Sequence, residues 1–355
     1  MKILVDMVHL ADVNFYKNAL NELNTRHEVT LAVLNRGNLL KVVTKEYPGF
    51  KVVPLGKHYK GKAGKIMGLL ERSFGFLKLC LSNRPDVVTS FGFYPGVVAK
   101  PLGIPAVLFH DDYEYQFIFN MCNRFATQFY IPDSIREKLP ASYRSGENEK
   151  IQFYNGFKET AYLKDFQPDE GCLERHDLVG KRFVFCRDID SISLNYDDYE
   201  LIDLAPAFQK LKDLGYTILY YPEKDHDRYD HLCRKMLGGI PDIMSLQYYA
   251  SLTISSGDTI ARESALVGTP VIYIGGRQMA VNLPLEEMGL IFSTEKQEEV
   301  LTLVDELLEP GFKTKLKEKI NAAGWEDITK VIVKALEKYT PRKDVKKRET
   351  SESLK

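Results

Sequence analysis

The clearest structural signal in the sequence is the stretch Leu252–Asn282, which reads LTISSGDTIARESALVGTPVIYIGGRQMAVN. A short apolar run ends at the serines, a Ser-Gly-Asp-Thr turn follows, and a helical pattern begins near Thr259. Gly268 suits the position just past a helix end, and Thr269-Pro270 leads into a second apolar run, Val271–Ile274. A strand, a helix and a strand in this order predict two parallel strands with a helix packed on their sheet.

The same alternation runs through most of the chain in two series, which are separated by the polar stretch Gly156–Gly180. It predicts an α/β fold with two Rossmann-like, doubly wound domains that face each other across a cleft. The runs predicted as strands are Ile3–Val5, Glu28–Leu34, Lys51–Pro54, Asp86–Ser90, Ala106–Phe109, Phe129–Ile131, Phe183–Cys186, Thr217–Tyr221, Leu252–Ser255 and Val271–Ile274.

This pattern predicts the domain boundaries. We expect a first domain over residues 1–165 and a second over residues 175–324, followed by a helix over 325–340 that crosses back to the first domain. The charged, aromatic-free tail 341–355 is expected to be disordered. Because such sheets bind ligands beyond the carboxyl ends of their strands, we expect the site in the cleft between the domains.

The composition excludes several classes of protein. The 355 residues carry 48 Lys and Arg against 49 Asp and Glu, so a net charge of −1 argues against a nucleic-acid binder with a generally basic surface. Five dispersed cysteines without a C-x-x-C motif predict neither disulfides nor a zinc knuckle. The opening MKILVDMVHL is typical of a strand, and no apolar run approaches the ~18 residues of a membrane span. We therefore expect a cytoplasmic protein, or one on the inner face of the membrane.

The turn in the stretch quoted first predicts a phosphate site. A helix that begins at the carboxyl end of a parallel strand presents unpaired N–H groups and a partial positive charge. The hydroxyl groups of Ser255, Ser256 and Thr259 would add hydrogen-bond donors. Gly257 would allow a ligand to approach the backbone closely.

Charged residues of the same helix refine this prediction. Arg262 is placed to neutralise a diphosphate, and Glu263 is placed to accept hydrogen bonds from sugar hydroxyls. Asp258 opposes the assignment, because a carboxylate beside a diphosphate repels it. In the alternative interpretation, Asp258 or Ser256 simply caps the helix.

A candidate catalytic base follows the first predicted strand. His9 suits the removal of a proton from an acceptor hydroxyl, because its unperturbed pKa is about 6.5. Asp12 is the candidate partner that orients its imidazole. The alternative is that His9 caps the following helix or packs under it.

Two more polar groups are expected at the cleft. His110, Asp111, Asp112 and Glu114 follow the strand Ala106–Phe109, and carboxylates this close are suited to acid–base chemistry, to cation binding or to acceptor recognition. The alternative is ordinary turn chemistry. Glu223 follows the strand Thr217–Tyr221 and is expected to line the cleft. His226 and His231 are five residues apart, which is the wrong interval for one helical face, so we interpret that region as a solvated helix start.

A basic and apolar segment, Lys57–Leu77, is a candidate membrane contact. Four lysines precede an apolar run, and the run holds Ile66, Met67, Leu69, Leu70, Phe74, Phe76 and Leu77. Such a combination suits docking on anionic lipid. The alternative is a lysine loop before an ordinary buried helix.

Several motifs resemble known enzymes. S-G-x-x-T-x-x-E followed by A-x-x-x-G-x-P, then Arg277-Gln278 and Asn282–Glu286, is similar to the nucleotide-sugar site of GT-B glycosyltransferases. Among these transferases, the likeness is greatest to the one that adds N-acetylglucosamine to the lipid-linked peptidoglycan precursor, although its Gly-rich first loop is absent here. Across nearly the whole chain, the likeness is stronger still to an uncharacterised family, domain of unknown function 354, and it is carried by VDMVHLADVNFYK, Asp112–Glu114, NGFKETAYLKDFQP and GDTIARESALVGTP.

The resemblance implies a function and assigns roles to residues. It implies a GT-B fold and a metal-independent glycosyltransferase that uses a nucleotide-sugar, by analogy a UDP-sugar, as substrate and needs no cofactor. Gly257–Ile260 would bind the diphosphate, Glu263 the ribose and Gln278 the donor sugar. Asp258 departs from the paired glycine that is usual at this position. The acceptor would be a cell-surface glycan or a lipid-linked sugar.

Two alternatives remain open from the sequence. One is an enzyme like the non-hydrolysing UDP-N-acetylglucosamine 2-epimerase, whose pattern resembles Asn123-Arg124. Its catalytic acids would align near Phe93 and Met121, which are not acidic, and only Asp112 falls where a carboxylate is expected. The other is a nucleotide-sugar-binding protein without catalytic activity, which Asp258 and the missing Gly-rich loop favour.

Overall fold

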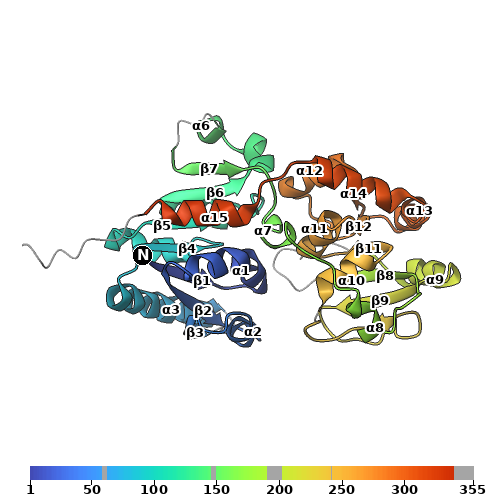
Figure 1. Cartoon of the computed structure of the whole chain (residues 1–355), viewed down its shortest axis with the longest axis horizontal. Helices are drawn as coiled ribbons and strands as arrows, with labels where there is room; N and C mark the ends of the chain where they lie inside the picture. Colours follow the sequence, from blue (N-terminus) through green and yellow to red (C-terminus); the bar gives the residue numbers. More distant parts are fainter. Residues whose placement is uncertain (58–61, 145–148, 190–201, 241, 340–355) are drawn as a thin grey trace, which may run out of the picture. The chain divides into compact units, whose positions relative to one another are not determined.

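The chain forms two compact units, each built on one parallel sheet (Figure 1). A computed structural model describes residues 1–57, 62–144, 149–189, 202–240 and 242–339. Unit 1 contains residues 1–156 and the described residues from Asp327 onward. Unit 2 contains Phe157–Glu326.

The sheet of unit 1 has seven described strands in the order β3-β2-β1-β4-β5-β6-β7, all parallel. The first six follow the Rossmann order, in which the winding reverses between β1 and β4. Ligands of such sheets bind outside the strand ends at this reversal. The strands are β1 (Lys2–Met7), β2 (Glu28–Asn35), β3 (Lys51–Lys57), β4 (Val87–Ser90), β5 (Ala106–Phe109), β6 (Gln128–Pro132) and β7 (Ile151–Tyr154).

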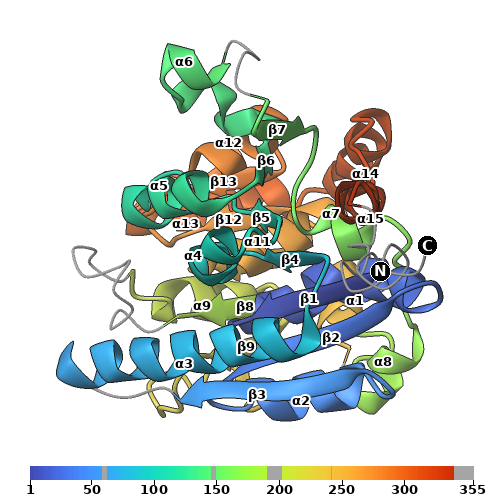
Figure 2. The same ribbon diagram turned by 90° about the vertical axis from the view of Figure 1, so that its left-hand side faces the viewer.

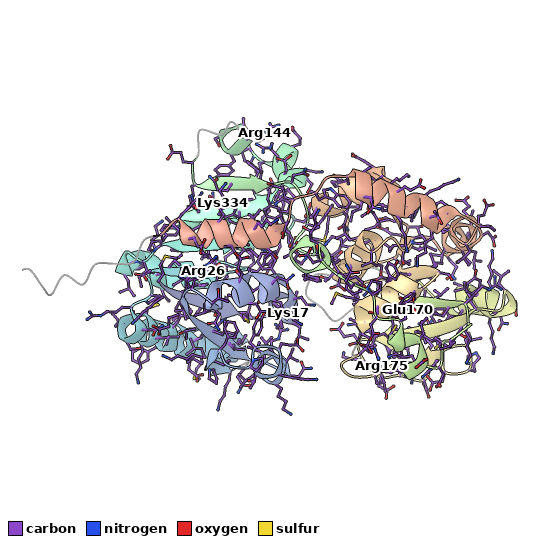
Figure 3. The ribbon with its side chains drawn as sticks, in the orientation of Figure 1. Lys17, Arg26, Arg144, Glu170, Arg175 and Lys334 are labelled. Atoms are coloured by element: carbon purple, nitrogen blue, oxygen red, sulfur yellow. The ribbon has the colours of Figure 1, made fainter. Side chains whose placement is uncertain are left out.

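The helices of unit 1 cover both faces of its sheet, as parallel strands require. The helix α3 runs beside β3 (Figure 2), and α15 packs against α1 although the two are far apart in sequence. Lys17 and Lys334 lie on the outer faces of α1 and α15, and Arg26 lies in the turn that follows α1 (Figure 3). The helices are α1 (Leu10–Asn24), α2 (Leu39–Glu46), α3 (Lys62–Asn83), α4 (Tyr94–Ala99), η1 (Lys100–Leu102), α5 (Gln116–Phe125), η2 (Asp133–Lys138), α6 (Ala141–Arg144) and α15 (Ile328–Glu337).

Unit 2 repeats the same plan. Its six described strands lie in the order β10-β9-β8-β11-β12-β13, so the winding reverses between β8 and β11. The strands are β8 (Phe183–Asp188), β9 (Thr217–Pro222), β10 (Arg234–Lys235), β11 (Leu252–Ser255), β12 (Val271–Tyr273) and β13 (Ile291–Ser293). The helices are α7 (Thr160–Leu163), α8 (Gly171–Arg175), α9 (Ala205–Asp213), α10 (Ile243–Tyr249), α11 (Asp258–Leu266), η3 (Ala280–Asn282), α12 (Leu283–Glu287), α13 (Gln297–Leu307) and α14 (Phe312–Ala322).

The core of unit 2 lies on both faces of its sheet. One cluster packs α9 and α13 against side chains that include Val184, Ile254 and Ile272. The other places Phe185 and Leu219 against α10. Neighbouring residues of β8 therefore belong to opposite clusters, as the alternation of side chains along a strand requires.

The structure confirms the predicted α/β fold class and all ten predicted strands. It adds three strands that the sequence pattern did not indicate, namely β7, β10 and β13. The solvated helix start expected around His226 is wrong, because residues 223–233 form turns and irregular backbone. This segment connects β9 to the two-residue edge strand β10 without a helix.

Candidate functional site

The turn after β11 is held by its own serines. The Ser255 hydroxyl donates to the carbonyl of Gly257 at 2.9 Å and accepts from the Gly257 N–H at 3.1 Å. The Ser256 hydroxyl donates to Asp188 Oδ1 at 3.1 Å and accepts from the Ile189 N–H at 2.7 Å. Both hydroxyl groups, expected from the sequence to bind phosphate, are therefore used to shape the turn.

Gly257 is the N-cap residue of α11. Its φ of −99° is open to any residue, so the left-handed region is not what favours glycine here. A Cβ at this position would come within 3.3 Å of Ile189 Cγ2. Thr259 and Ile260 follow in the first turn and are half-buried. The N-terminus of α11 therefore lies at the carboxyl end of β11, as the sequence predicts, and its cap residue has no side chain.

Asp258 is neutralised by residues of the next loop. Its Oδ2 lies 3.0 Å from Arg277 Nη1, and its Oδ1 accepts from the Tyr273 hydroxyl at 2.5 Å. The loop that follows Tyr273 lies close to the turn before α11. A Cβ at Gly275 would come within 2.5 Å of the Ser256 carbonyl oxygen, so only glycine fits at this position. Gln278, in the same loop, is exposed. The guanidinium of Arg277 thus compensates the charge that opposed a phosphate site.

Arg262 has a different environment from the one expected. It is 1% exposed, and its Nε donates to Glu159 Oε1 at 2.9 Å while Nη1 donates to Asn282 Oδ1 at 3.0 Å. Glu159 is fully buried and also pairs with Lys158 at 3.0 Å. Arg262 therefore neutralises a carboxylate of the chain, which corrects the expectation that its charge faces a diphosphate. The reason is that Arg262 lies on the side of α11 that packs against the segment before α7.

Glu263 is a buried carboxylate held by neutral donors. It is 4% exposed, and it accepts from the Tyr162 hydroxyl at 2.7 Å and from Gln247 Nε2 at 3.2 Å. Burial raises its pKa, and the hydrogen bonds from Tyr162 and Gln247 only partly oppose this. Each carboxylate oxygen has a second lone pair that a ligand hydroxyl can use. The placement is compatible with recognition of a ribose that reaches a buried carboxylate.

In unit 1, Asp12 organises the loop after β1. It is 2% exposed, and its Oδ2 accepts from the N–H groups of Val8 and His9 at 2.8 and 2.9 Å. His9 is the N-cap residue of α1. Asp12 thus positions His9 through the main chain, and the N-cap position of His9 agrees with the alternative interpretation of the sequence. Partial desolvation, together with the cations of Arg36 and Arg72, lowers the pKa of His9 and keeps its imidazole neutral.

The polar group after β5 spans three environments. His110 and Asp111 are buried, Asp112 is half-buried and Glu114 is exposed. The Oδ1 of Asp112 accepts from the Tyr115 N–H at 3.0 Å, which is ordinary turn chemistry. His110 packs between the rings of Phe91 and Phe119. These residues lie at the carboxyl edge of the sheet, as predicted, and differ strongly in their access to solvent.

Glu223 belongs to a hollow of about 400 Å³ at the carboxyl ends of β8 and β9. Asp188 and His226 line the same hollow. Burial raises the pKa of Asp188. The sequence analysis missed Asp188 and Tyr220, and it named Arg277 only within a motif, without a role. The signal that could have found Asp188 is its position, since it follows the apolar run Phe183–Cys186 by two residues and is the last residue of β8.

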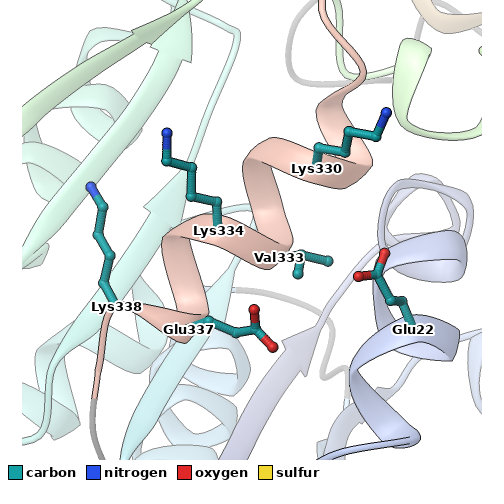
Figure 4. Close-up of a pocket in the computed structure, with 6 residues that line it drawn as sticks. All are labelled: Glu22, Lys330, Val333, Lys334, Glu337 and Lys338. Atoms are coloured by element: carbon teal, nitrogen blue, oxygen red, sulfur yellow. The ribbon is translucent and has the colours of Figure 1, made fainter.

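A second hollow, of about 360 Å³, lies in unit 1 between α15 and α1 (Figure 4). Lys330, Lys334 and Lys338 recur every four residues along α15, while Glu337 faces α1. Arg26 pairs with Glu337 at 3.0 Å. The walls of this hollow are helix faces with exposed ion pairs, so it lacks the buried polar groups that a catalytic site needs.

Two kinds of feature are absent from the described residues. No group of three or more His, Cys, Asp or Glu among them is arranged to hold a metal ion. Within the same residues, every helix is too short or too polar to cross a membrane. The helix α3 nevertheless exposes three large apolar side chains in a row, since Met67, Leu70 and Phe74 are 62%, 64% and 71% exposed. Residues 58–61 of the lysine-rich segment lie outside the described residues.

Comparisons with known proteins agree with this architecture. The sequence profile described as "Protein of unknown function (DUF354)" matches residues 1–340. The uncharacterized protein MJ0665 of Methanocaldococcus jannaschii is 22% identical over 326 residues, which cover 87% of this chain and 92% of that protein.

Solved structures show the same fold at low sequence identity. The UDP-GlcNAc 2-epimerase of Neisseria meningitidis, bound to UDP-GlcNAc, has a TM-score of 0.65 at 13% identity and covers 95% of this chain and 100% of its own. MurG of Acinetobacter baumannii has a TM-score of 0.56 at 14% identity and covers 95% and 100%. The fold is therefore of the GT-B type, as predicted.

Proposed function

The chain belongs to the DUF354 family, proteins of unknown function, and we propose that it is a glycosyltransferase that transfers a sugar from a UDP-sugar to a glycan or lipid-linked acceptor. The observation that carries the proposal is the N-terminus of α11, which lies at the carboxyl end of β11 beside the reversal of the sheet and is capped by a glycine. Structures with this fold include an epimerase bound to UDP-GlcNAc and the enzyme MurG.

The donor nucleotide binds to unit 2. The N–H groups of the first turn of α11, from Gly257 to Ile260, receive the diphosphate, because a helix N-terminus carries a partial positive charge. Glu263 accepts a hydrogen bond from the ribose, and the exposed Gln278 contacts the donor sugar. The departing diphosphate gains negative charge, which the helix dipole stabilises without a metal ion.

Arg277 takes the role that was expected of Arg262. Its guanidinium lies 3.0 Å from Asp258, the first residue of α11, and both side chains are 12% exposed. A cation held at this distance from the helix N-terminus is suited to a diphosphate, because the short ion pair fixes its position before the ligand arrives.

The acceptor binds to unit 1. His9, with its lowered pKa, is the base that removes the proton of the acceptor hydroxyl. Asp12 holds the loop that carries it. The group after β5 supplies acceptor contacts, with Asp112 and the exposed Glu114 accepting from hydroxyls and the buried His110 and Asp111 supporting them.

A membrane contact follows from the acceptor class. A lipid-linked acceptor requires an enzyme that reaches the bilayer surface. The apolar row Met67, Leu70 and Phe74 on α3, preceded by the lysines of Lys57–Leu77, is the surface for this contact. The enzyme then acts in the cytoplasm at the inner face of the membrane, and it has no nucleic-acid partner.

Thermal unfolding with UDP, GDP, CDP, dTDP and their sugar conjugates tests the donor site. Bound ligand at 100 times its Kd adds about 2.7 kcal/mol to stability, which moves the Tm by several degrees. We expect UDP to bind, and we expect Arg277→Gln to weaken UDP binding about tenfold, the loss of one charge-assisted contact. The matched control is Arg175→Gln, which breaks an exposed arginine–aspartate pair elsewhere in unit 2. If no nucleotide moves the Tm of the wild-type protein, the donor-site proposal is wrong.

A 2-epimerase is the second candidate, because the epimerase structure has the higher TM-score, 0.65 against 0.56 for MurG. The two activities differ in their need for an acceptor. An epimerase converts UDP-GlcNAc without any acceptor, which proton NMR detects as a new anomeric signal. A glycosyltransferase releases UDP only when its acceptor is present. Nucleotide binding with neither reaction would support a binding protein without catalytic activity.

A further inference from the structure

A chain of hydrogen bonds connects the α11 turn to the hollow at the ends of β8 and β9. The Ser256 hydroxyl donates to Asp188 Oδ1 at 3.1 Å, and the Tyr220 hydroxyl donates to Asp188 Oδ2 at 2.9 Å. The Tyr220 oxygen also lies 2.9 Å from His226 Nε2. Asp188 and His226 both line the hollow, so these hydrogen bonds connect two residues of its wall.

The donors in this chain fix the tautomer of His226. Tyr220 has one hydroxyl proton, and Asp188, which accepts from two hydroxyls, receives it. His226 Nε2 must therefore carry a proton and donate it to the Tyr220 oxygen. In the neutral imidazole this leaves Nδ1 as an acceptor with a free lone pair.

His226 Nδ1 is buried and has no hydrogen-bond partner among the described residues. A buried polar atom without a partner costs free energy, so it marks a place where a ligand or a water belongs. The wall around it holds the acceptors Asp188, Glu223 and Asp225 together with the donors Lys224 and Arg228. A ligand suited to this wall both donates and accepts hydrogen bonds, and a ring that carries several hydroxyl groups has this chemistry.

The hollow adjoins the proposed donor site. Asp188 ends β8, Ser256 follows β11, and these two strands are neighbours at the reversal of the sheet. A ligand whose diphosphate lies at the α11 turn therefore has the hollow beside it. Two rings of a nucleotide-sugar carry hydroxyl groups, namely the ribose and the transferred hexose.

We propose that this hollow binds a hydroxylated ring of the nucleotide-sugar, with one ring hydroxyl donating its hydrogen bond to His226 Nδ1. The placement rests on the proposed function, because it assumes that the diphosphate lies at α11. Tyr220 and Asp188 act as positioning residues, since they hold the imidazole in the tautomer that accepts.

Calorimetric binding constants for four ligands test the proposal with the full-length chain. The ligands are inorganic pyrophosphate, 2′,3′-dideoxyuridine diphosphate, UDP and UDP-GlcNAc. The test variant is His226→Phe, which keeps a ring but removes both nitrogens, and the control is His231→Phe at an exposed histidine of the same segment. Tyr220→Phe releases the tautomer while it preserves the packing of a fully buried ring.

We expect His226→Phe to weaken the binding of hydroxyl-bearing ligands five- to tenfold, which corresponds to the loss of one neutral hydrogen bond. The affinity for pyrophosphate should stay unchanged. A loss with both UDP and UDP-GlcNAc, absent with the dideoxy compound, assigns the ring to ribose. A loss with UDP-GlcNAc alone assigns it to the hexose. Tyr220→Phe should give a smaller loss with the same ligands, and the His231 variant none.

Three results would overturn the proposal. An equal loss with pyrophosphate would mean that His226 only shapes the phosphate turn. A loss that persists with the dideoxy compound would place the base in the hollow. No change with any ligand would mean that Nδ1 meets water only.

If the wild-type chain binds no nucleotide at all, the proposed function fails separately. The hollow is then tested with free ribose and free N-acetylglucosamine, while NMR follows the imidazole signals of His226. A shift of these signals in the wild-type protein, together with none for His231, supports the hollow as a hydroxyl site. Unshifted signals overturn it.

Discussion

Two helices, α1 in unit 1 and α11 in unit 2, both begin at the carboxyl edge of a parallel sheet. They differ in the side chains that lie at their N-termini. At α1, the carboxylate of Asp12 accepts from the N–H groups of Val8 and His9. At α11, the N-cap residue is Gly257, which has no side chain to accept from the helix. The carboxylate nearest to that end, Asp258, pairs with Arg277 and Tyr273.

The difference indicates where an external anion belongs. A helix N-terminus attracts negative charge, and unit 1 supplies this charge from within the chain. Unit 2 places a glycine there and adds the guanidinium of Arg277 nearby. We therefore expect phosphate chemistry on unit 2 and proton transfer by His9 on unit 1.

The largest expected effect concerns the buried arginine of unit 2. Arg262→Met removes one of the two cations that pair with the buried Glu159 and leaves only Lys158, which should destabilise unit 2 by about 3 kcal/mol. Trp325 is the single tryptophan and lies in unit 2, packed on Phe157, so its fluorescence in urea reports this unit. The double variant Glu159→Gln with Arg262→Met should recover only part of the loss, because the buried Lys158 then loses its contact with the Glu159 carboxylate.

Unit 1 contains a matched control for this variant. Arg72 forms a buried ion pair with Asp6, so Arg72→Met should cause a similar loss that far-ultraviolet circular dichroism detects. The tryptophan transition of unit 2 should not follow it. If Arg262→Met leaves stability intact and abolishes UDP binding, Arg262 faces the ligand after all, and the role given to Arg277 is wrong.

An intermediate effect is expected at the capped helix. Asp12→Ala removes the acceptor of two N–H groups and should destabilise unit 1 by about 1–2 kcal/mol. Circular dichroism in urea measures this loss, and Asp12→Asn, which keeps one carbonyl oxygen, should lose less. The binding of UDP should stay unchanged in both variants. A variant that keeps full stability would show that water replaces the carboxylate, and the contrast between α1 and α11 would then disappear.

Sequence patterns predicted the elements of this fold better than its contacts. Strands such as Leu252–Ser255 were predictable because a strand buried on both faces is continuously apolar. The strand β10 has only two residues and β13 only three, too few for a pattern to emerge. Position at a strand end identified His9 and Glu223 as candidates, since topology brings strand ends to one edge.

The partners of charged side chains could not be predicted from the sequence. Arg262 and Arg277 are both near the α11 turn in sequence, and only the fold decides which faces Glu159 and which faces Asp258. Glu159 precedes α11 by about a hundred residues, so no local spacing connects them. The serines of the turn were assigned to a ligand for the same reason, because the acceptor Asp188 comes from another strand.

The smallest expected effect separates stability from binding at Glu263. Burial raises its pKa, so the folded protein holds this proton more tightly than the unfolded chain does. Stability therefore falls as the pH rises from the ordinary pKa of glutamate through the raised value, and the ionised carboxylate is a cost at neutral pH. Asp12 differs, since two N–H groups compensate its charge.

Glu263→Gln should consequently stabilise unit 2 at pH 7.5, by on the order of 1 kcal/mol, because it removes a buried charge. The amide can still accept from Tyr162, and Gln247 has an unpaired Oε1 that can accept from the new amide after a flip. The gain should shrink toward zero as the pH falls to about 4, where the wild-type carboxyl is protonated. The same substitution should lower the affinity for UDP, because the ribose loses a charged acceptor. Tryptophan fluorescence in urea at several pH values measures the stability, and calorimetry measures the affinity. A variant less stable than wild type at every pH would show that the Glu263 carboxylate is compensated in the folded chain. Glu263 would then resemble Asp12 of unit 1.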